Sequence, residues 1–138
     1  MIPDRRDDRL DEGFTLVELL VVVVVLAVLA AVAVPVTLEH RRKAADAGVK
    51  TDLRALAEAQ ETHYTDHETY LAVPVSSAPV VIDRIDLSPG NTVSVTLNAH
   101  GTAYCVTGTN LRASHPWVYL SSAGGQQPAS VTSCPASF

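Results

Sequence analysis

One acidic residue lies inside a long apolar run, from Phe14 to Val34, that carries no other charge. A carboxylate at membrane depth costs about 2.5 kcal/mol or more unless it finds a partner or a shallow position. Two interpretations of Glu18 stay open: it lies near enough to the interface to reach headgroups and water, or it pairs with a cation from another chain. No basic residue lies within one helical turn of Glu18 in this sequence.

The two cysteines, Cys105 and Cys134, lie in the last third of the chain. No metal-type spacing such as C-x-x-C gives them another role, so we predict a single disulfide. In an oxidising compartment, closing this loop contributes on the order of 3 kcal/mol to stability. The pair therefore favours export of the C-terminal part.

Other residues with catalytic or metal-binding potential form no known pattern. His63 and His67 are four residues apart, but Tyr64 follows His63 and the H-E-x-x-H motif is absent. Serine and threonine are plentiful, yet there is no G-x-S-x-G elbow, phosphate loop or Asp/His/Ser constellation. We expect no enzymatic activity, no metal and no cofactor. Trp117 and Tyr119 are either exposed adhesive aromatics or core residues, and the core interpretation is favoured.

The apolar run itself is long enough, as a helix, to cross a hydrocarbon core of ~30 Å at ~1.5 Å per residue. The valines favour a strand in water, but an unpaired strand in lipid leaves backbone groups unsatisfied, so we predict a helix. A secretory signal is cleaved at a small-residue site after its apolar region, whereas Gly13 precedes this one. We therefore expect the anchor to be retained.

The charge distribution limits the possible partners and the orientation. The chain has 138 residues and a net charge of -5, which allows one modest domain and gives no electrostatic case for nucleic acid. The basic residues flank the apolar run equally: Arg5, Arg6 and Arg9 precede it, and Arg41, Arg42 and Lys43 follow it. Since the positive-inside rule does not decide, the cysteines and the strand-rich C-terminal part favour an exported C-terminus.

The sequence GFTLVEL at residues 13–19, followed by the apolar run and Pro35, resembles the processing site and anchor of type IV pilins and pseudopilins. In that family a membrane aspartic peptidase cuts after the glycine and methylates the new amine. The resemblance implies cleavage between Gly13 and Phe14 and an N-methylated Phe14. Glu18 then occupies the fifth mature position, where the family glutamate pairs with the N-terminal amine of a neighbouring subunit.

Each part of this motif has a physical reason. Gly13 has no Cβ, so the backbone can enter a narrow protease site in an extended form. A charge that is costly in lipid becomes tolerable when a partner arrives, so pairing of Glu18 favours assembly and sets the axial register. Pro35 removes a backbone donor, and we expect the helix to kink or loosen there. The alternative is that Pro35 simply ends the membrane helix.

The segment from Thr37 to Thr65 has a helical pattern of packing positions. The recurring positions are Ala45, Val49, Leu53, Leu56, Gln60 and Tyr64. We interpret the opposite face as solvated, and its charged members are Asp52, Arg54, Glu58 and Glu61. The basic run at residues 41–43 is expected to meet headgroups before assembly and acidic residues of neighbours afterwards.

The C-terminal part has the pattern of a small antiparallel meander. We predict strands at Thr92–Leu97, Ala103–Thr107 and Trp117–Leu120, with a turn at Asn98–Gly101. The proline- and serine-rich segment Val73–Gly90 is predicted to be a loop with little regular structure. The tail from Ser121 to Phe138 is also predicted to be loop-like, held by Cys134.

We therefore predict an α+β fold in which one long helix packs on a small antiparallel sheet, as in pilins. The expected divisions are a leader at residues 1–13, an assembly helix at 14–36 and an extracytoplasmic head at 37–138. The resemblance implies a helical homopolymer served by a prepilin peptidase and a membrane assembly machinery. The precursor is expected in the cytoplasmic membrane, and the product in an extracellular filament.

Alternative functions share the same anchor. A pseudopilin of a type II secretion or DNA-uptake machine forms a short piston, but secretion pseudopilins commonly bind calcium in a C-terminal loop. Residues 121–138 contain no acidic side chain, which weakens that alternative. A minor pilin that recognises a ligand at a filament tip is the third possibility.

Overall fold

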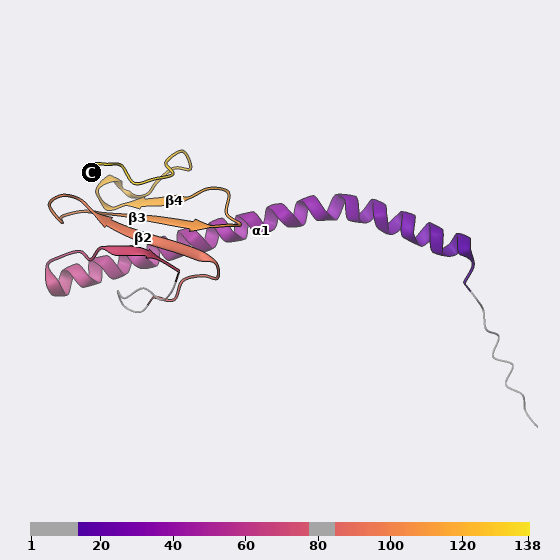
Figure 1. Cartoon of the computed structure of the whole chain (residues 1–138), viewed down its shortest axis with the longest axis horizontal. Helices are drawn as coiled ribbons and strands as arrows, with labels where there is room; N and C mark the ends of the chain where they lie inside the picture. Colours follow the sequence, from indigo (N-terminus) through magenta and orange to yellow (C-terminus); the bar gives the residue numbers. More distant parts are fainter. Residues whose placement is uncertain (1–13, 78–84) are drawn as a thin grey trace, which may run out of the picture. The chain divides into compact units, whose positions relative to one another are not determined.

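The computed structural model describes residues 14–77 and 85–138, which form one long helix and a five-stranded sheet (Figure 1). Helix α1 runs from Leu16 to His67. The chain divides into two compact units, Met1–Thr37 and Leu38–Phe138, and α1 contributes to both. The predicted leader, including Gly13, lies outside the described residues.

The N-terminus of α1 is capped by Thr15. Its hydroxyl accepts a hydrogen bond from the Glu18 backbone N–H at 3.2 Å, and its carbonyl accepts one from the Leu19 N–H at 3.2 Å. The sequence Thr-x-x-Glu at this position is a capping-box pattern. The helix therefore has a defined start two residues after Phe14.

Helix α1 continues through Pro35, so the interpretation that this proline ends the membrane helix is wrong. A proline removes one intrahelical hydrogen bond, but the apolar residues on both sides keep the helical pattern. The Thr37 hydroxyl donates to the Ala33 carbonyl at 2.8 Å on the turn that contains the proline. The expected kink at Pro35 stays a prediction.

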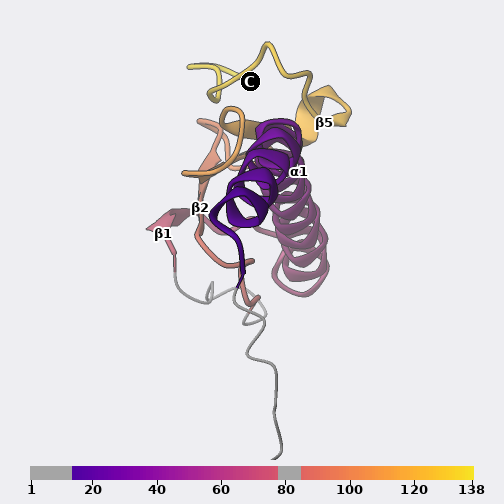
Figure 2. The same ribbon diagram turned by 90° about the vertical axis from the view of Figure 1, so that its right-hand side faces the viewer.

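The sheet is an antiparallel meander in which each strand pairs with the next, in the order β1-β2-β3-β4-β5. Its strands are β1 Val73–Ser76, β2 Asn91–Leu97, β3 Tyr104–Asn110, β4 Trp117–Leu120 and β5 Gly125–Gln126. Viewed from the end, β1 and β5 lie at opposite edges (Figure 2). The predicted fold class and the three central strands are confirmed.

Two hydrophobic clusters cover the two faces of the sheet. The larger one joins the second half of α1 to the inner face, with Val49, Leu53 and Leu56 of the helix fully buried against residues such as Val93 and Val106. The smaller cluster contains Cys105, Val118 and Leu120, against which Val131, Cys134 and Phe138 of the tail pack. The sheet is thus a middle layer between α1 and the C-terminal tail.

A close helix–sheet approach is made possible by Gly108 on β3. A Cβ at this position would lie 2.7 Å from Cγ1 of Val49 and 3.1 Å from Cδ2 of Leu53. Any side chain there would push the helix away from the sheet, so glycine sets the spacing of the two layers.

The two edge strands were not predicted. Val73–Ser76 forms β1, so the loop interpretation of Val73–Gly90 is wrong for its first residues, and residues 78–84 lie outside the described part. Pro74 fits an edge strand, because one side of such a strand makes no ladder hydrogen bonds. The tail is not wholly loop-like either, since it contains a 3-10 turn at Ser121–Ala123 and the two-residue strand β5.

The predicted solvated face of α1 is confirmed at Arg54 and Glu58, which are exposed, but it is wrong at Asp52. Asp52 is only 4% exposed and accepts hydrogen bonds from the Ser88 N–H at 2.8 Å, the Ser88 hydroxyl at 2.8 Å and Asn91 Nδ2 at 2.6 Å. Asn91 Oδ1 in turn accepts from Asn110 Nδ2 at 2.6 Å. The carboxylate thus joins α1 to β2 and β3.

Candidate assembly surface

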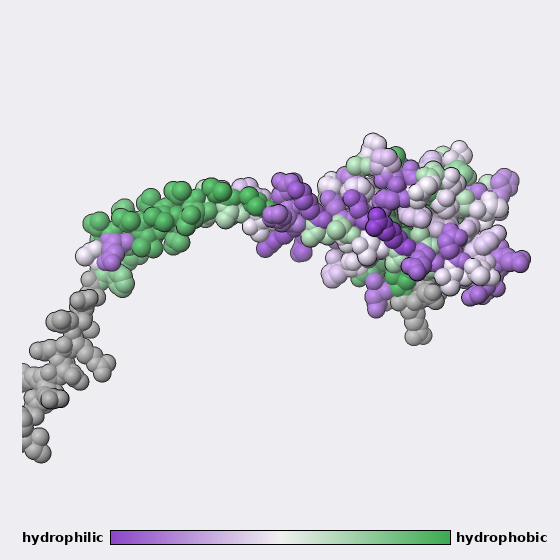
Figure 3. Space-filling model, turned by 180° about the vertical axis from the view of Figure 1, so that it is seen from behind, coloured by the Kyte–Doolittle hydropathy of each residue, from purple (hydrophilic) through white to green (hydrophobic). Residues whose placement is uncertain are grey.

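The first part of α1 presents an apolar surface without a partner in the described residues. Every Phe, Leu and Val side chain from residue 14 to 36 exposes between 50% and 81% of its surface. The space-filling view shows this surface as hydrophobic, in contrast to the mixed surface of the head (Figure 3). A helix that is apolar on all sides belongs in a membrane or inside an assembly. Within the described chain, α1 is the one helix long and apolar enough to cross a membrane.

Glu18 is the single charged side chain of this surface and lies in the first turn of α1. The positive end of the helix dipole favours a carboxylate there. Its backbone N–H is capped by Thr15, but among residues 14–77 and 85–138 its carboxylate forms no ion pair. The geometry therefore presents an unneutralised carboxylate at the N-terminal end of an apolar helix.

The two residues that follow the expected cleavage point are not helical. Phe14 is 80% exposed, and both Phe14 and Thr15 precede the first helical residue. Gly13 falls outside the described residues. An exposed, non-helical Phe14 is compatible with binding in the extended form that a protease requires, and the assignment of Gly13 and Phe14 to processing stays a prediction.

The disulfide predicted between Cys105 and Cys134 is present, with 29 residues of sequence separation. It joins β3 to the tail on the face of the sheet that is turned away from α1. Because Cys105 is fully buried, the bond fixes the tail over the sheet. It therefore contributes to the head and not to the apolar surface.

The basic run after the apolar segment is exposed. Lys43 Nζ pairs with Glu39 at 3.0 Å, and the hydrogen bond and charge of Lys43 lower the pKa of the Glu39 carboxyl. Arg41 and Arg42 lie between these two residues in the chain, and both side chains are exposed to external anions. It stays a prediction that these residues meet headgroups before assembly and acidic residues of neighbours afterwards.

The core interpretation of Trp117 is confirmed, since only 9% of the side chain is exposed. Its indole N–H donates to Asp46 Oδ1 at 2.9 Å, and Lys50 Nζ lies 3.6 Å from the ring centre. Asp46 also accepts from the Ser114 N–H and hydroxyl, each at 2.9 Å. Burial opposes ionisation of Asp46, but the hydrogen bonds from Trp117 and Ser114 outweigh it and lower its pKa. Sequence patterns gave no sign of this role for Asp46.

A row of aromatic rings lines the other end of the head. Tyr104 is fully buried and donates to Glu61 Oε1 at 2.9 Å, while Tyr70 donates to Glu61 Oε2 at 3.2 Å. Burial, followed by the neighbouring Glu61, raises the pKa of Tyr104 far above its ordinary value. Tyr119 is half-buried and packs against the same core. These tyrosines therefore act as structural residues.

The two histidines near the end of α1 lie against each other. Their rings stack with 4.2 Å between centroids, and His67 Nδ1 lies 3.2 Å from the His63 carbonyl oxygen. Among the described residues, no group of three or more His, Cys, Asp or Glu side chains is placed to hold a metal ion. The histidine pair is thus best described as a stacked contact.

Comparison with known proteins relates the apolar surface to a family. Residues 8–34 match the prokaryotic N-terminal methylation motif. The chain is 32% identical over 95 residues to the type IV wide pilus major component PilA4 of Thermus thermophilus, covering 69% of this chain and 70% of that protein. It is 35% identical over 60 residues to the type IV major pilin protein PilA of Myxococcus xanthus, which is 44% of this chain and 27% of the relative. It is also 39% identical over 62 residues to the type II secretion system core protein G of Pseudomonas aeruginosa, covering 45% and 44%.

Proposed function

Because this chain belongs to the type IV pilin family, we propose that it is a structural subunit of a type IV pilus. One observation carries the proposal. Up to residue 36, α1 is apolar on all sides and has no partner among the described residues, whereas its second part, residues 38–67, packs into a hydrophobic core with the sheet of the same chain. A folded head attached to an unsatisfied helix is what a polymerising subunit requires. The proposed divisions are a leader at residues 1–13, an assembly helix at 14–36 and a head at 37–138.

We propose that the subunit occupies two locations, one after the other. As a precursor it is anchored in the cytoplasmic membrane by the helix at residues 14–36, with the head exported. A prepilin peptidase then cuts between Gly13 and Phe14 and methylates the new amine. The membrane assembly machinery finally transfers the subunit into an extracellular filament, where copies of this chain are its main partners.

Glu18 supplies the energetic difference between the two locations. Lipid tails are as apolar as the side chains of a neighbouring helix, so apolar contact alone gives little preference for assembly over the membrane. An unpaired carboxylate in lipid is costly, and this cost is relieved when Glu18 meets the cationic amine of Phe14 in a neighbouring copy. The pairing also fixes how far each subunit is displaced along the filament.

The function does not require catalysis. The family to which the chain belongs consists of structural proteins, and the polar groups of the head are used in hydrogen bonds that join its elements. Asp46 and Asp52, for example, each hold donors from a distant loop or strand. We propose that the chain is not an enzyme.

A pseudopilin of a type II secretion system is the second candidate, since the similarity to the core protein G favours it. The two candidates share the anchor and differ in the head and in the length of the polymer. The tail of this chain is held by the Cys105–Cys134 disulfide, and residues 121–138 contain no acidic side chain for a calcium ion.

The proposal is tested by the intact mass of the protein in filaments sheared from its native host. A structural pilin should give the mass of residues Phe14 to Phe138 plus one methyl group and minus two hydrogens for the disulfide. A pseudopilin should carry the same modifications but be absent from long surface filaments. An uncleaved chain that stays in the membrane while the peptidase is active would contradict both candidates.

A further inference from the structure

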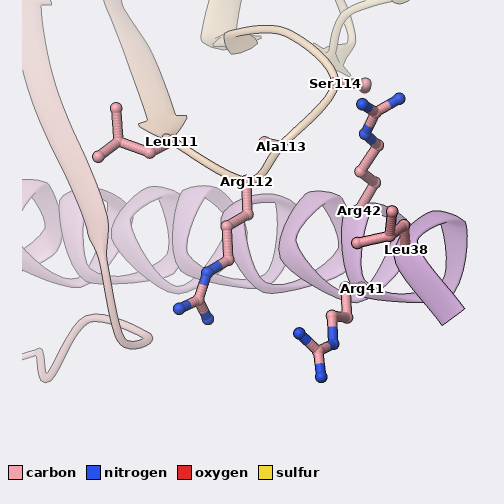
Figure 4. Close-up of a pocket in the computed structure, with 7 residues that line it drawn as sticks. All are labelled: Leu38, Arg41, Arg42, Leu111, Arg112, Ala113 and Ser114. Carbon is pink, nitrogen blue, oxygen red and sulfur yellow. The ribbon is translucent and has the colours of Figure 1, made fainter. Parts of the chain in front are cut away.

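A groove at the start of the head is bordered by three arginines and two leucines. It has a volume of about 510 Å³ and lies between the beginning of the second part of α1 and the loop after β3. Its lining residues are Leu38, Arg41, Arg42, Leu111, Arg112, Ala113 and Ser114 (Figure 4). Arg41 and Arg112 extend to the same side of α1, whereas Arg42 runs toward Ser114.

The loop that carries Leu111 and Arg112 is held in a defined shape. Asn110 Oδ1 accepts from the Arg112 N–H at 2.9 Å, and the Asn110 carbonyl accepts from the Ala113 N–H at 3.0 Å. Ser114 is fixed to α1 through both oxygens of Asp46. The turn presents Leu111 with its side chain entirely exposed. A single exposed leucine is ordinary on a protein surface, so Leu111 supports a binding site only together with the arginines beside it.

The guanidinium groups of the groove form no ion pair with the nearby acids, although the charge of Arg42 is the smallest of the causes that lower the pKa of Glu39. Within residues 14–77 and 85–138, Arg41, Arg42 and Arg112 form no ion pair. The two acidic residues on the adjoining turns of α1 are already engaged, since Glu39 pairs with Lys43 and both Asp46 oxygens accept hydrogen bonds. Three cations therefore remain in a chain whose net charge is -5.

The groove begins where the chain leaves the apolar segment. Leu38 is two residues after the end of the 14–36 helix, and Arg41 and Arg42 lie within the next helical turn. If residues 14–36 occupy the hydrocarbon core, the chain itself places these arginines at the level of the headgroups. Guanidinium groups bind phosphate oxygens in a forked geometry, and leucine beside them suits the boundary between headgroups and acyl chains.

We propose that this groove binds the phosphate groups of anionic lipids and docks the head of the unassembled subunit on the bilayer, with Leu111 entering the interface. The inference rests on the membrane-anchored stage of the proposed function, not on filament formation. Each arginine near an anionic surface strengthens docking about fivefold. The acidic chain as a whole is repelled by the same surface, so docking depends on these three side chains.

The test uses the full chain, one copy per nanodisc, with a Leu111→Trp reporter. The discs contain phosphatidylcholine brominated near the headgroup, either alone or mixed with phosphatidylglycerol. Bromine quenches indole fluorescence on contact, and the unmodified chain, with its single buried Trp117, gives the background. We expect strong quenching at position 111 in the phosphatidylglycerol discs and weak quenching in phosphatidylcholine alone.

Two further variants in the reporter background decide the role of the arginines. Substituting Arg41, Arg42 and Arg112 together by Gln should lower the ratio of docked to undocked heads on the order of 100-fold. Arg54→Gln, on an exposed part of α1 outside the groove, should leave quenching unchanged. Equal quenching in both lipids, or quenching that survives the triple substitution, would overturn the proposal.

The same discs distinguish lipid docking from contact with a second copy, and a failure of docking from a failure of the anchor to insert. The fluorescence of the reporter could instead shift to the blue only when two chains share a disc, without bromine quenching. That result would assign the groove to a second copy and overturn lipid docking. Co-elution of the chain with the discs reports the anchor independently. A chain that does not enter the discs would contradict both the anchored stage and the docking, whereas insertion without quenching contradicts docking alone.

Discussion

The two parts of α1 are made of similar apolar residues but differ in where their partners come from. Val49, Leu53 and Leu56 are completely buried against the sheet of the same chain. Between residues 14 and 36, every Phe, Leu and Val exposes at least half of its surface. The same kind of side chain therefore stabilises the fold in one part and is left for an external partner in the other.

The polar groups show the same difference. In the second part of α1, Asp52 holds Ser88 and Asn91, and Gln60 exchanges two hydrogen bonds with the backbone of Leu71, at 2.5 and 2.9 Å. In the first part, the carboxylate of Glu18 forms no ion pair within the described residues. Substitutions in the two parts should therefore separate folding from assembly.

The largest expected effect on the head is loss of the disulfide. Replacing both Cys105 and Cys134 by Ser removes a link across 29 residues and should lower the free energy of unfolding of the head by about 3–4 kcal/mol. Thermal unfolding of the full chain in detergent, followed by circular dichroism, measures this change. An unchanged midpoint would show that the disulfide adds nothing to the stability of the head.

A matched pair of leucine substitutions sharpens the comparison along α1. Leu53→Ala leaves a cavity between helix and sheet and should lower the free energy of unfolding of the head by about 3 kcal/mol. Leu26→Ala removes the same atoms from a side chain that is 59% exposed and should leave the stability of the head unchanged. Equal destabilisation by the two substitutions, measured by the same melts, would contradict the separation.

The buried carboxylate gives a smaller effect. Asp52→Ala leaves Ser88 and Asn91 without their acceptor and should lower the free energy of unfolding by about 2 kcal/mol. Asp66→Ala, at an exposed position near the end of α1, is the control and should be neutral. Denaturant unfolding of both variants checks this, and a neutral Asp52→Ala would mean that water replaces the lost bonds.

The smallest effect is the pH dependence contributed by Asp46. Its pKa in the folded head is lowered from an ordinary value of 3.8, so its contribution is present above that pH and is lost as the pH falls through the folded pKa. Because the side chain is partly exposed, the contribution should be below about 1 kcal/mol. Asp46→Asn should flatten the acid side of a stability-versus-pH curve. A curve identical to that of the unmodified chain would show that Asp46 does not contribute through its charge.

Local patterns predicted the parts of the fold that are regular over many residues. The apolar run, the packing stripe around Leu53 and the alternating strand Thr92–Leu97 each repeat a period that sequence reveals. Edge strand β1 contains Pro74, and β5 has only two residues, so neither shows a period. Asp52 was assigned to the wrong face because its charge suggested exposure, although it lies three residues after Val49 and four before Leu56 on the packing face. The partners that make its burial possible lie 36 and 39 residues away, where no local pattern shows them.

The sequence signal of the candidate assembly surface is more local than that of the head, and its role in assembly stays a prediction. Its main signal, a single carboxylate in an apolar run, needs no tertiary contact to be recognised. The turn that presents Leu111 and Arg112 had no such signal, because it depends on Asn110 and on a contact between Ser114 and Asp46, 68 residues away. A surface formed by one helix can therefore be predicted from the sequence. A surface formed by a helix and a distant loop can be identified only in the structure.

The division of α1 into a part for assembly and a part for folding is tested most directly by Glu18→Gln in the native host, with two readouts on the same protein. The yield of sheared filaments reports assembly, and the unfolding midpoint of the detergent-solubilised full chain reports the head. We expect filaments to fall to a small fraction of their normal amount while the midpoint stays unchanged, because the proposed partner of Glu18 lies in another copy. Normal filaments would contradict the proposed role of Glu18 in assembly, and a destabilised head would contradict the separation of this part of α1 from the fold of the head.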